Sequence, residues 1–149
     1  MDFIAGLFKM GNATTINKVN FEDLQWIIKG QTPYLLINTL NKTKQNCLIQ
    51  GTIPIDQEVS IINKNINNKK LRIIIYGRNT NDDRIINKYK QLMGLGFLNI
   101  FIYPGGLFEW LCLQDIYGFE QFPTTKRELD ILKFKATPKI SNLNLLTNA

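Results

Sequence analysis

One segment of this chain constrains its fold most: a strongly apolar stretch that leads directly into a polar loop and then a helix. Residues 71–84 read LRIIIYGRNTNDDR. In an open α/β domain, ligands bind where the carboxyl end of a strand leads into a helix, because unpaired N–H groups and the positive end of the helix dipole point there. A catalytic group is expected directly after Tyr76. That position is Gly77, which cannot act as a nucleophile, a base or a metal ligand.

Strand-like and helix-like segments alternate along most of the chain. The helix over residues 82–95 is the clearest, because its apolar residues recur at helical spacing. Asn20 is suited to cap the helix over residues 21–29. The alternation, with its short loops, predicts a three-layer α/β/α fold around a mostly parallel sheet. The remaining predicted elements are strands over residues 15–19, 34–39, 71–76 and 98–103, a brief extended piece over residues 47–49, and helices over residues 58–63 and 107–117.

The helix predicted over residues 107–117 is apolar around most of its circumference, so something besides the sheet must cover it. The extension over residues 119–135 is rich in aromatic and aliphatic side chains and can serve as that cover. Thr125 and Glu128 form a capping-box pair that predicts a short helix there. An intermolecular interface is the alternative to this internal cover. Its candidate residues are Phe108, Trp110, Leu111, Phe119 and Phe122.

The length of 149 residues fits one domain, which we expect over residues 15–135. Residues 1–14 are interpreted as an N-terminal flap, and residues 136–149 as a loosely ordered tail. The start of the chain lacks the basic region of a signal peptide, and no apolar run reaches the length of a membrane span. Two cysteines without a CxxC motif indicate free thiols. Together these features predict a cytoplasmic protein.

Composition also excludes several classes of site. The chain has no histidine and two cysteines, which rules out histidine-based triads and histidine metal sites and leaves too few thiols for zinc. We therefore expect no metal and no cofactor. The net charge is +6, and the densest basic cluster comprises Lys64, Lys69, Lys70 and Arg72. No aromatic residue is interleaved for base stacking, so a solvated loop is favoured over contact with nucleic acid or anionic lipid.

Four segments, in this order, resemble a rhodanese domain. The last of them is the most specific, because a strand, a double glycine and a tryptophan recur at the family's spacing. The resemblance covers roughly residues 15–118. The segments are LLIN at residues 35–38, GTIP at 51–54, IIIYG at 73–77 and GFLNIFIYPGGLFEW at 96–110.

The resemblance implies sulfur transfer through a cysteine directly after the central strand, but this chain departs at every site position. The cysteine position falls on Gly77, the family's acidic residue falls on Asn38, and the arginine that follows falls on Leu40. Thr52 replaces the histidine of the family's GHIPGA-like turn. Dual-specificity phosphatases of the same fold end their loop with an arginine, a position that Arg84 approaches, but the nucleophile is missing for that chemistry too.

The resemblance to non-catalytic family members implies a binding, scaffolding or regulatory module with a protein partner. One alternative is a persulfide carrier that uses Cys47, which is expected to be more exposed than Cys112 in its apolar helix. Another is a small-anion sensor at the loop, although Asp82 and Asp83 are suited to cap the following helix internally. The loop candidates are Gly77, Arg78, Asn79, Thr80, Asn81, Asp82 and Asp83. The oligomeric state is left open.

Overall fold

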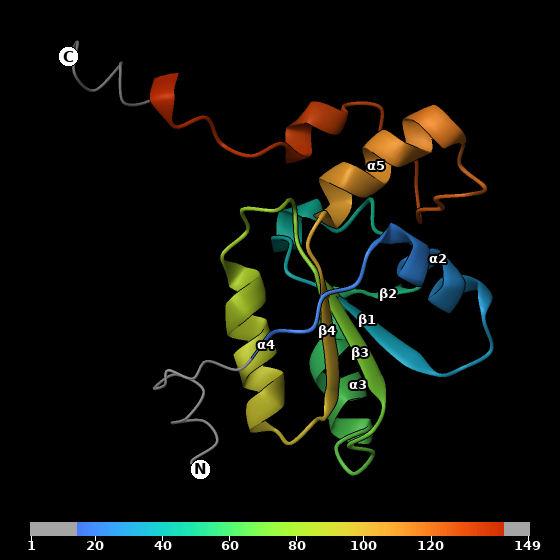
Figure 1. Cartoon of the computed structure of the whole chain (residues 1–149), viewed down its shortest axis with the longest axis vertical. Helices are drawn as coiled ribbons and strands as arrows, with labels where there is room; N and C mark the ends of the chain where they lie inside the picture. Colours follow the sequence, from blue (N-terminus) through green and yellow to red (C-terminus); the bar gives the residue numbers. More distant parts are fainter. Residues whose placement is uncertain (1–14, 142–149) are drawn as a thin grey trace.

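Four parallel strands form the centre of the structure, a computed structural model that describes residues 15–141. The strand order is β2-β1-β3-β4, so the central strand of the sequence motif, β3, lies inside the sheet (Figure 1). The register pairs Tyr76 with Asn38 on one side and with Tyr103 on the other. These three residues therefore end their strands side by side. The strands are β1 (Tyr34–Asn38), β2 (Thr52–Ile53), β3 (Arg72–Tyr76) and β4 (Asn99–Tyr103).

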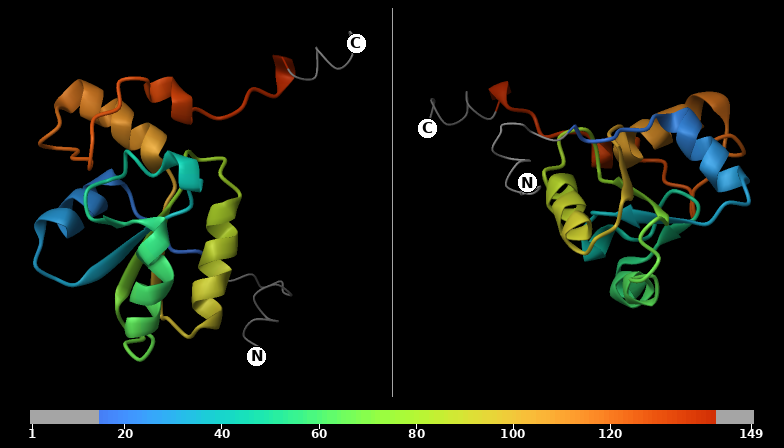
Figure 2. Two further views of the ribbon diagram at one scale, coloured as in Figure 1. Left: turned by 180° about the vertical axis from the view of Figure 1, so that it is seen from behind. Right: turned by 60° about the horizontal axis from the view of Figure 1, so that its bottom comes forward.

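Helices cover both faces of the sheet, which confirms the predicted three-layer α/β/α fold. α2 (Phe21–Lys29) and α5 (Gly106–Tyr117) lie on one face, and α3 (Glu58–Lys64) and α4 (Arg84–Gly94) lie on the other (Figure 2). β3 alternates between the two cores, as a strand must. Its Ile74 side chain packs with α2 and α5. None of the helices within residues 15–141 has the length and hydrophobicity to cross a membrane.

Local sequence signals account for the ends of the best-predicted helices. Asn20 caps α2 through a capping box, in which its side chain accepts a hydrogen bond from the Asp23 N–H and the Asp23 carboxylate accepts one from the Asn20 N–H. Gly106 has a φ of +68°, a region that favours glycine. A Cβ at Gly106 would lie 2.7 Å from the carbonyl oxygen of Gly77, so the loop after β3 and the start of α5 approach closely only with glycine there.

Three predicted elements differ from the structure. The strand expected over residues 15–19 is reduced to a single parallel bridge between Lys18 and Ile102, and the piece over residues 47–49 is reduced to a bridge between Ile49 and Thr124. The capping box at Thr125 is wrong, because the Thr125 hydroxyl oxygen accepts a hydrogen bond from the Leu48 N–H instead. The extension forms a short 3-10 helix, η3 (Ile131–Phe134). Two further 3-10 turns are η1 (Lys42–Lys44) and η2 (Ile55–Gln57).

The extension after α5 packs back onto the domain. Phe122 and Phe134 are buried in the core formed by α2, α5 and the sheet. The rings of Trp110 and Phe122 meet edge to face, with centroids 5.0 Å apart. The extension therefore supplies the internal cover expected for α5. The N-terminal flap predicted over residues 1–14 lies outside the described residues, as does the tail beyond residue 141.

Candidate functional site

The loop after β3 lies against the start of α5. Gly77 follows Tyr76, whose side chain is fully buried. The carbonyl of Gly77 accepts a hydrogen bond from the Leu107 N–H at 2.9 Å, and the Arg78 carbonyl accepts one from the Phe108 N–H at 3.0 Å. The first free amides of α5 thus bind the backbone of the loop. They are not available to a ligand.

The Asp82 carboxylate fills the centre of the loop. Its Oδ2 accepts hydrogen bonds from the Thr39 hydroxyl at 2.9 Å and the Arg78 N–H at 3.1 Å. Its Oδ1 accepts hydrogen bonds from the backbone N–H and the Nε of Arg84, at 3.0 and 3.1 Å. A Cβ placed on Gly77 would lie 2.8 Å from both the Asp82 Cγ and the Thr39 Oγ1. The space that a side chain at position 77 needs is therefore occupied.

The electrostatics of the loop follow from these contacts. The Asp82 side chain is 4% exposed, and burial acts to raise the pKa of its carboxyl. The hydrogen bonds from Arg84, Arg78 and Thr39 outweigh burial and hold the pKa of Asp82 below its ordinary value. Asp82 is thus an internal anion in the cradle. Asp83, expected to share the capping role, makes no side-chain capping hydrogen bond at the start of α4.

The remaining loop residues hold the extension in place or lie in solvent. Arg78 Nη2 donates to the carbonyl of Lys133 at 2.8 Å, and Asn79 Nδ2 donates to the carbonyl of Phe134 at 2.9 Å. Asn79 Oδ1 also accepts from the Asn81 N–H. Thr80 and Asn81 are exposed. Arg78 and Asn79 therefore connect the loop to η3.

The other positions that correspond to rhodanese site residues have structural contacts here. Asn38 Oδ1 accepts hydrogen bonds from the Leu40 N–H and from Gln45 Nε2. The Leu40 side chain is buried. The Thr52 hydroxyl donates to the Ile49 carbonyl at 2.6 Å and shares a hydrogen bond with the Tyr76 hydroxyl. Each of these side chains is used by the fold, and none of them carries a charge that could act on a ligand at the loop.

Neither cysteine has the surroundings of a reactive thiol. The expectation that Cys47 is the more exposed is wrong: Cys47 is 4% exposed, and its thiol donates to the Lys126 carbonyl. The extension covers it. Cys112 is partly exposed on α5. Burial raises the pKa of both thiols, which disfavours the thiolate that sulfur chemistry needs.

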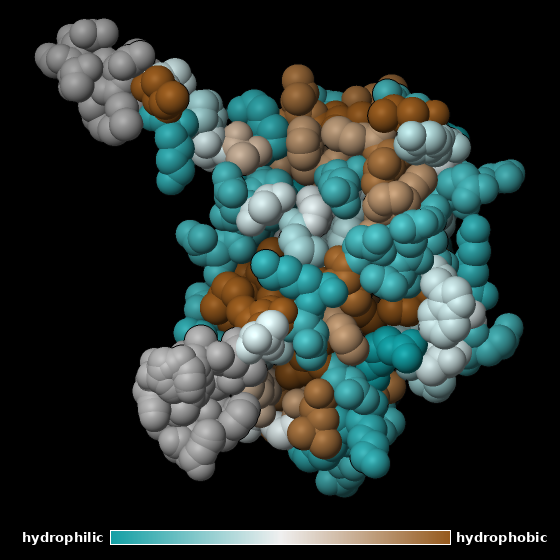
Figure 3. All heavy atoms as spheres, in the orientation of Figure 1, coloured by the Kyte–Doolittle hydropathy of each residue, from teal (hydrophilic) through white to brown (hydrophobic). Residues whose placement is uncertain are grey.

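The surface expected on α5 is largely interior. Trp110, Leu111 and Phe122 are each at most 3% exposed, so they cannot contact a partner in this structure, because the extension and the sheet already cover them. Phe108 and Phe119 are half-buried, and the Phe119 ring packs against the Arg127 guanidinium. The exposed apolar side chains are different ones, Ile116 and Tyr117 at the end of α5 and Leu129 and Leu132 in the extension. Figure 3 shows hydrophobic surface at the top of the molecule, over α5.

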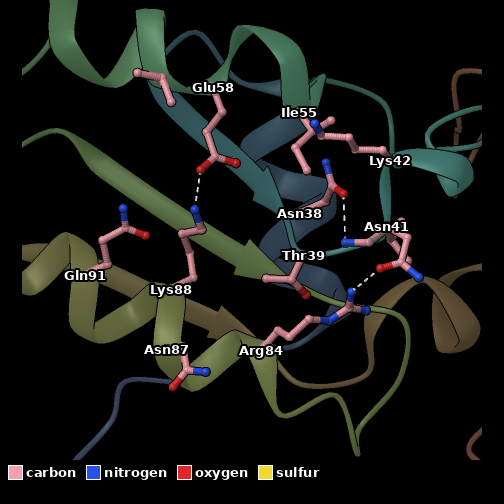
Figure 4. Close-up of a pocket in the computed structure, with 12 residues that line it drawn as sticks. Asn38, Thr39, Asn41, Lys42, Ile55, Glu58, Arg84, Asn87, Lys88 and Gln91 are labelled. Carbon is pink, nitrogen blue, oxygen red and sulfur yellow. Dashed lines mark hydrogen bonds and ion pairs between the residues drawn. The ribbon is translucent and has the colours of Figure 1, made fainter.

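A cleft of about 510 Å³ lies beside the closed loop, between α3, α4 and the segment after β1 (Figure 4). Arg84 reaches across its floor, where Nη1 donates to Asn41 Oδ1 at 2.6 Å. Lys88 forms an ion pair with Glu58, whose side chain is 8% exposed. Sequence reasoning did not identify this cleft. The signal was present, since the side chains that α4 contributes have helical i, i+3, i+4, i+7 spacing. They are Arg84, Asn87, Lys88 and Gln91.

Within residues 15–141, no group of three or more histidine, cysteine or acidic side chains is placed to hold a metal ion. A second hollow beside the loop is lined by Arg78, Arg84 and Lys139 among other residues. In this hollow and in the cleft, the positive charge comes from arginine and lysine side chains. These cationic side chains are suited to bind anions. The exceptions are the donors of Arg78 and Arg84 that already bind the Asp82 carboxylate.

Comparison with known proteins identifies the fold. No family model matches the sequence, and no curated protein matches it. The solution structure of the rhodanese-like domain of the Alr3790 protein from Anabaena sp. is 18% identical, with a TM-score of 0.52 over 85% of this chain and 95% of that domain. The yeast protein Ygr203w, described as a tyrosine phosphatase of the rhodanese family, is 14% identical, with a TM-score of 0.56 over 79% and 97% of the two chains.

A third structure is the thiosulfate sulfurtransferase from Pseudomonas aeruginosa. It is 16% identical with a TM-score of 0.51, over 64% of this chain and 18% of that enzyme. Identities at this level show a shared fold and nothing of the chemistry. The fold expected from the sequence is thus confirmed.

Proposed function

We propose that this chain, which has the rhodanese-like fold, is a binding or regulatory module that neither transfers sulfur nor hydrolyses phosphate esters. The observation that carries the proposal is the position of Asp82. Its carboxylate fills the cradle in which an enzyme of this fold would hold a reactive sulfur, next to a glycine at the nucleophile position.

Electrostatics support the same conclusion. Thiosulfate and phosphate monoesters are anions, and a nucleophile for either needs loop N–H groups that are free to stabilise negative charge. Here the Arg78 and Arg84 amides already donate to Asp82. The fixed carboxylate also repels an incoming anion. For this reason we favour a non-catalytic module over a small-anion sensor at the loop.

A persulfide carrier that uses Cys47 is disfavoured on physical grounds. A carrier thiol must be accessible to its donor and partly ionised. Cys47 is buried under the extension, and burial raises its pKa. Cys112 is more accessible, but burial also raises its pKa, and the carboxylates of Asp115 and Glu109 raise it further.

The partner that we propose is another protein, as for the non-catalytic proteins that the sequence resembles. The exposed apolar side chains at the end of α5 and in the extension are consistent with this role, Tyr117 and Leu129 among them. Both cysteines are free. Free thiols are typical of a reducing compartment, so we further propose a cytoplasmic location.

Turnover assays on the purified full chain test the proposal. We expect no thiocyanate from thiosulfate and cyanide, and no p-nitrophenol from p-nitrophenyl phosphate, above the level of a Cys47→Ser/Cys112→Ser double variant. That control lacks any thiol, and its fold is checked by circular dichroism before the assay. Activity of the natural chain above the control would overturn the proposal, and its loss in Cys47→Ser alone would establish the carrier.

A further inference from the structure

The cleft between α3 and α4 has the dimensions of a small-molecule site. Its volume of about 510 Å³ falls within the range of pockets that enclose small ligands. It lies at the carboxyl end of β1, on the α3–α4 face of the sheet. The closed loop borders it through Arg84, whose Nε and backbone N–H hold Asp82. Asp82 fills the cradle but does not line the cleft, so the cleft remains open.

Charge in the cleft favours an anion. Three cationic side chains line it, Lys42, Arg84 and Lys88, against the single carboxylate of Glu58. Lys88 is neutralised by Glu58, and Arg84 is engaged by Asp82 and Asn41. Lys42 forms no ion pair with any described residue. Of the three cations, Lys42 is thus the one that can pair with a ligand, and a single negative charge matches it. Because Lys42 is exposed, the gain from this pair is modest.

Polar and apolar groups are arranged on different walls. Asn87 and Gln91 lie one turn apart on α4, and within residues 15–141 neither side chain makes a hydrogen bond to another residue. Ile55 and Val59 line the opposite wall, where Val59 is 71% exposed. An apolar side chain so exposed at the rim of a cleft gains from contact with a ligand's hydrocarbon part.

We propose that this cleft binds a small organic acid, with one carboxylate near Lys42 and an apolar body against Ile55 and Val59. A carboxylate is preferred to a phosphate because it matches the single unbalanced charge. This inference deepens the proposed binding role and rests on it, since a catalytic site would require a reactive group that the cleft lacks.

Titration of the ¹⁵N-labelled full chain with hexanoate tests the proposal. A ligand of this size is expected to bind with a Kd of about 1 mM. We expect saturable shifts of the amide signals of Lys42, Val59 and Asn87. Lys42→Ala should weaken binding about three- to five-fold, the range of an exposed charge pair. Lys64→Ala, which removes an exposed lysine of α3 outside the cleft, should leave it unchanged.

Two analogues complete the design. Hexanamide keeps the apolar body without the charge and should bind about three- to five-fold more weakly than hexanoate, as expected for loss of the same exposed charge pair. Hexyl phosphate should bind no more tightly than hexanoate. Equal binding of hexanamide, tighter binding of hexyl phosphate, shifts confined to residues 77–83 or no shifts at all would each overturn the proposal. The turnover assays above are independent of this titration, so thiocyanate production would refute the non-catalytic role without imitating any of these outcomes.

Discussion

The Asp82 carboxylate lies where a side chain at position 77 would begin, with its Cγ 2.8 Å from the Cβ that Gly77 lacks. The two residues are complementary: glycine leaves the space, and the aspartate fills it and satisfies the amides around it. Introducing a cysteine at position 77 alone would therefore create a clash.

We predict that Gly77→Cys lowers the free energy of unfolding by about 1–3 kcal/mol, as overpacking of a filled site does. Gly77→Cys combined with Asp82→Ala should cost less than the sum of the single changes, because the two side chains compete for one space. Urea unfolding of the four proteins measures this coupling. Gly94→Ala is the matched control, since no atom outside its chain neighbours and the backbone of its own helix lies within 4 Å of the added Cβ. Additive effects would contradict the interpretation.

Asp82→Ala should expose the donors that the carboxylate now satisfies. Leaving the Arg78 and Arg84 amides unpaired is expected to cost about 2 kcal/mol of stability. The emptied cradle should then bind sulfate, which raises the melting temperature of this variant beyond the general salt effect on the natural chain. Asp83→Ala, which removes a carboxylate with no capping hydrogen bond, is the control. An equal response to sulfate in all three proteins would argue against a latent anion site.

The same carboxylate predicts how stability depends on pH. Folding holds the pKa of Asp82 below its ordinary value of 3.8. A lowered pKa in the folded state means that the stabilisation is fully present above the ordinary value and is lost as the pH falls through the folded-state pKa. The stability difference between the natural chain and Asp82→Asn should thus be constant near neutrality and shrink in acid below that value. A difference that grows on acidification would refute the assignment.

Much of the fold was predictable because its determinants are local. The apolar run before Gly77 and the Asn20 cap specify a buried strand and a helix start within a few residues. The strand predicted over residues 15–19 was wrong, because this segment pairs with β4 only around Ile102, through a single bridge to Lys18. The extent of such pairing depends on β4, which is distant in the sequence.

The site was less predictable because its contacts are distant in sequence. Asp82 could be read as a helix cap, but its contact with Thr39 joins positions 43 residues apart. Arg78 and Asn79 bind backbone carbonyls of η3, and a carbonyl acceptor leaves no mark in the sequence. The burial of Cys47 likewise depends on the extension that folds over it.

The two thiols should differ in accessibility to a reagent. Cys112 is partly exposed, whereas Cys47 is 4% exposed and covered by the extension. Under native conditions we expect Ellman's reagent to modify Cys112 first, and Cys47 only at the rate at which the extension opens. Mass spectrometry of peptides from timed reactions measures both rates, with Cys112→Ser as the control that isolates Cys47. Faster native modification of Cys47 would reopen the carrier hypothesis.

The extension should be a structural part of the domain. Phe134 is 2% exposed in the core under α5, and the Asn79 side chain donates to its carbonyl. Phe134→Ala is therefore expected to lower the free energy of unfolding by about 3–5 kcal/mol, the cost of truncating a buried aromatic side chain. Leu129→Ala removes a side chain of the same extension that is 91% exposed, and should change stability by less than about 0.5 kcal/mol. Denaturant unfolding distinguishes the two. A Phe134→Ala variant as stable as Leu129→Ala would show that the extension is dispensable, and Cys47 would then lose its protection.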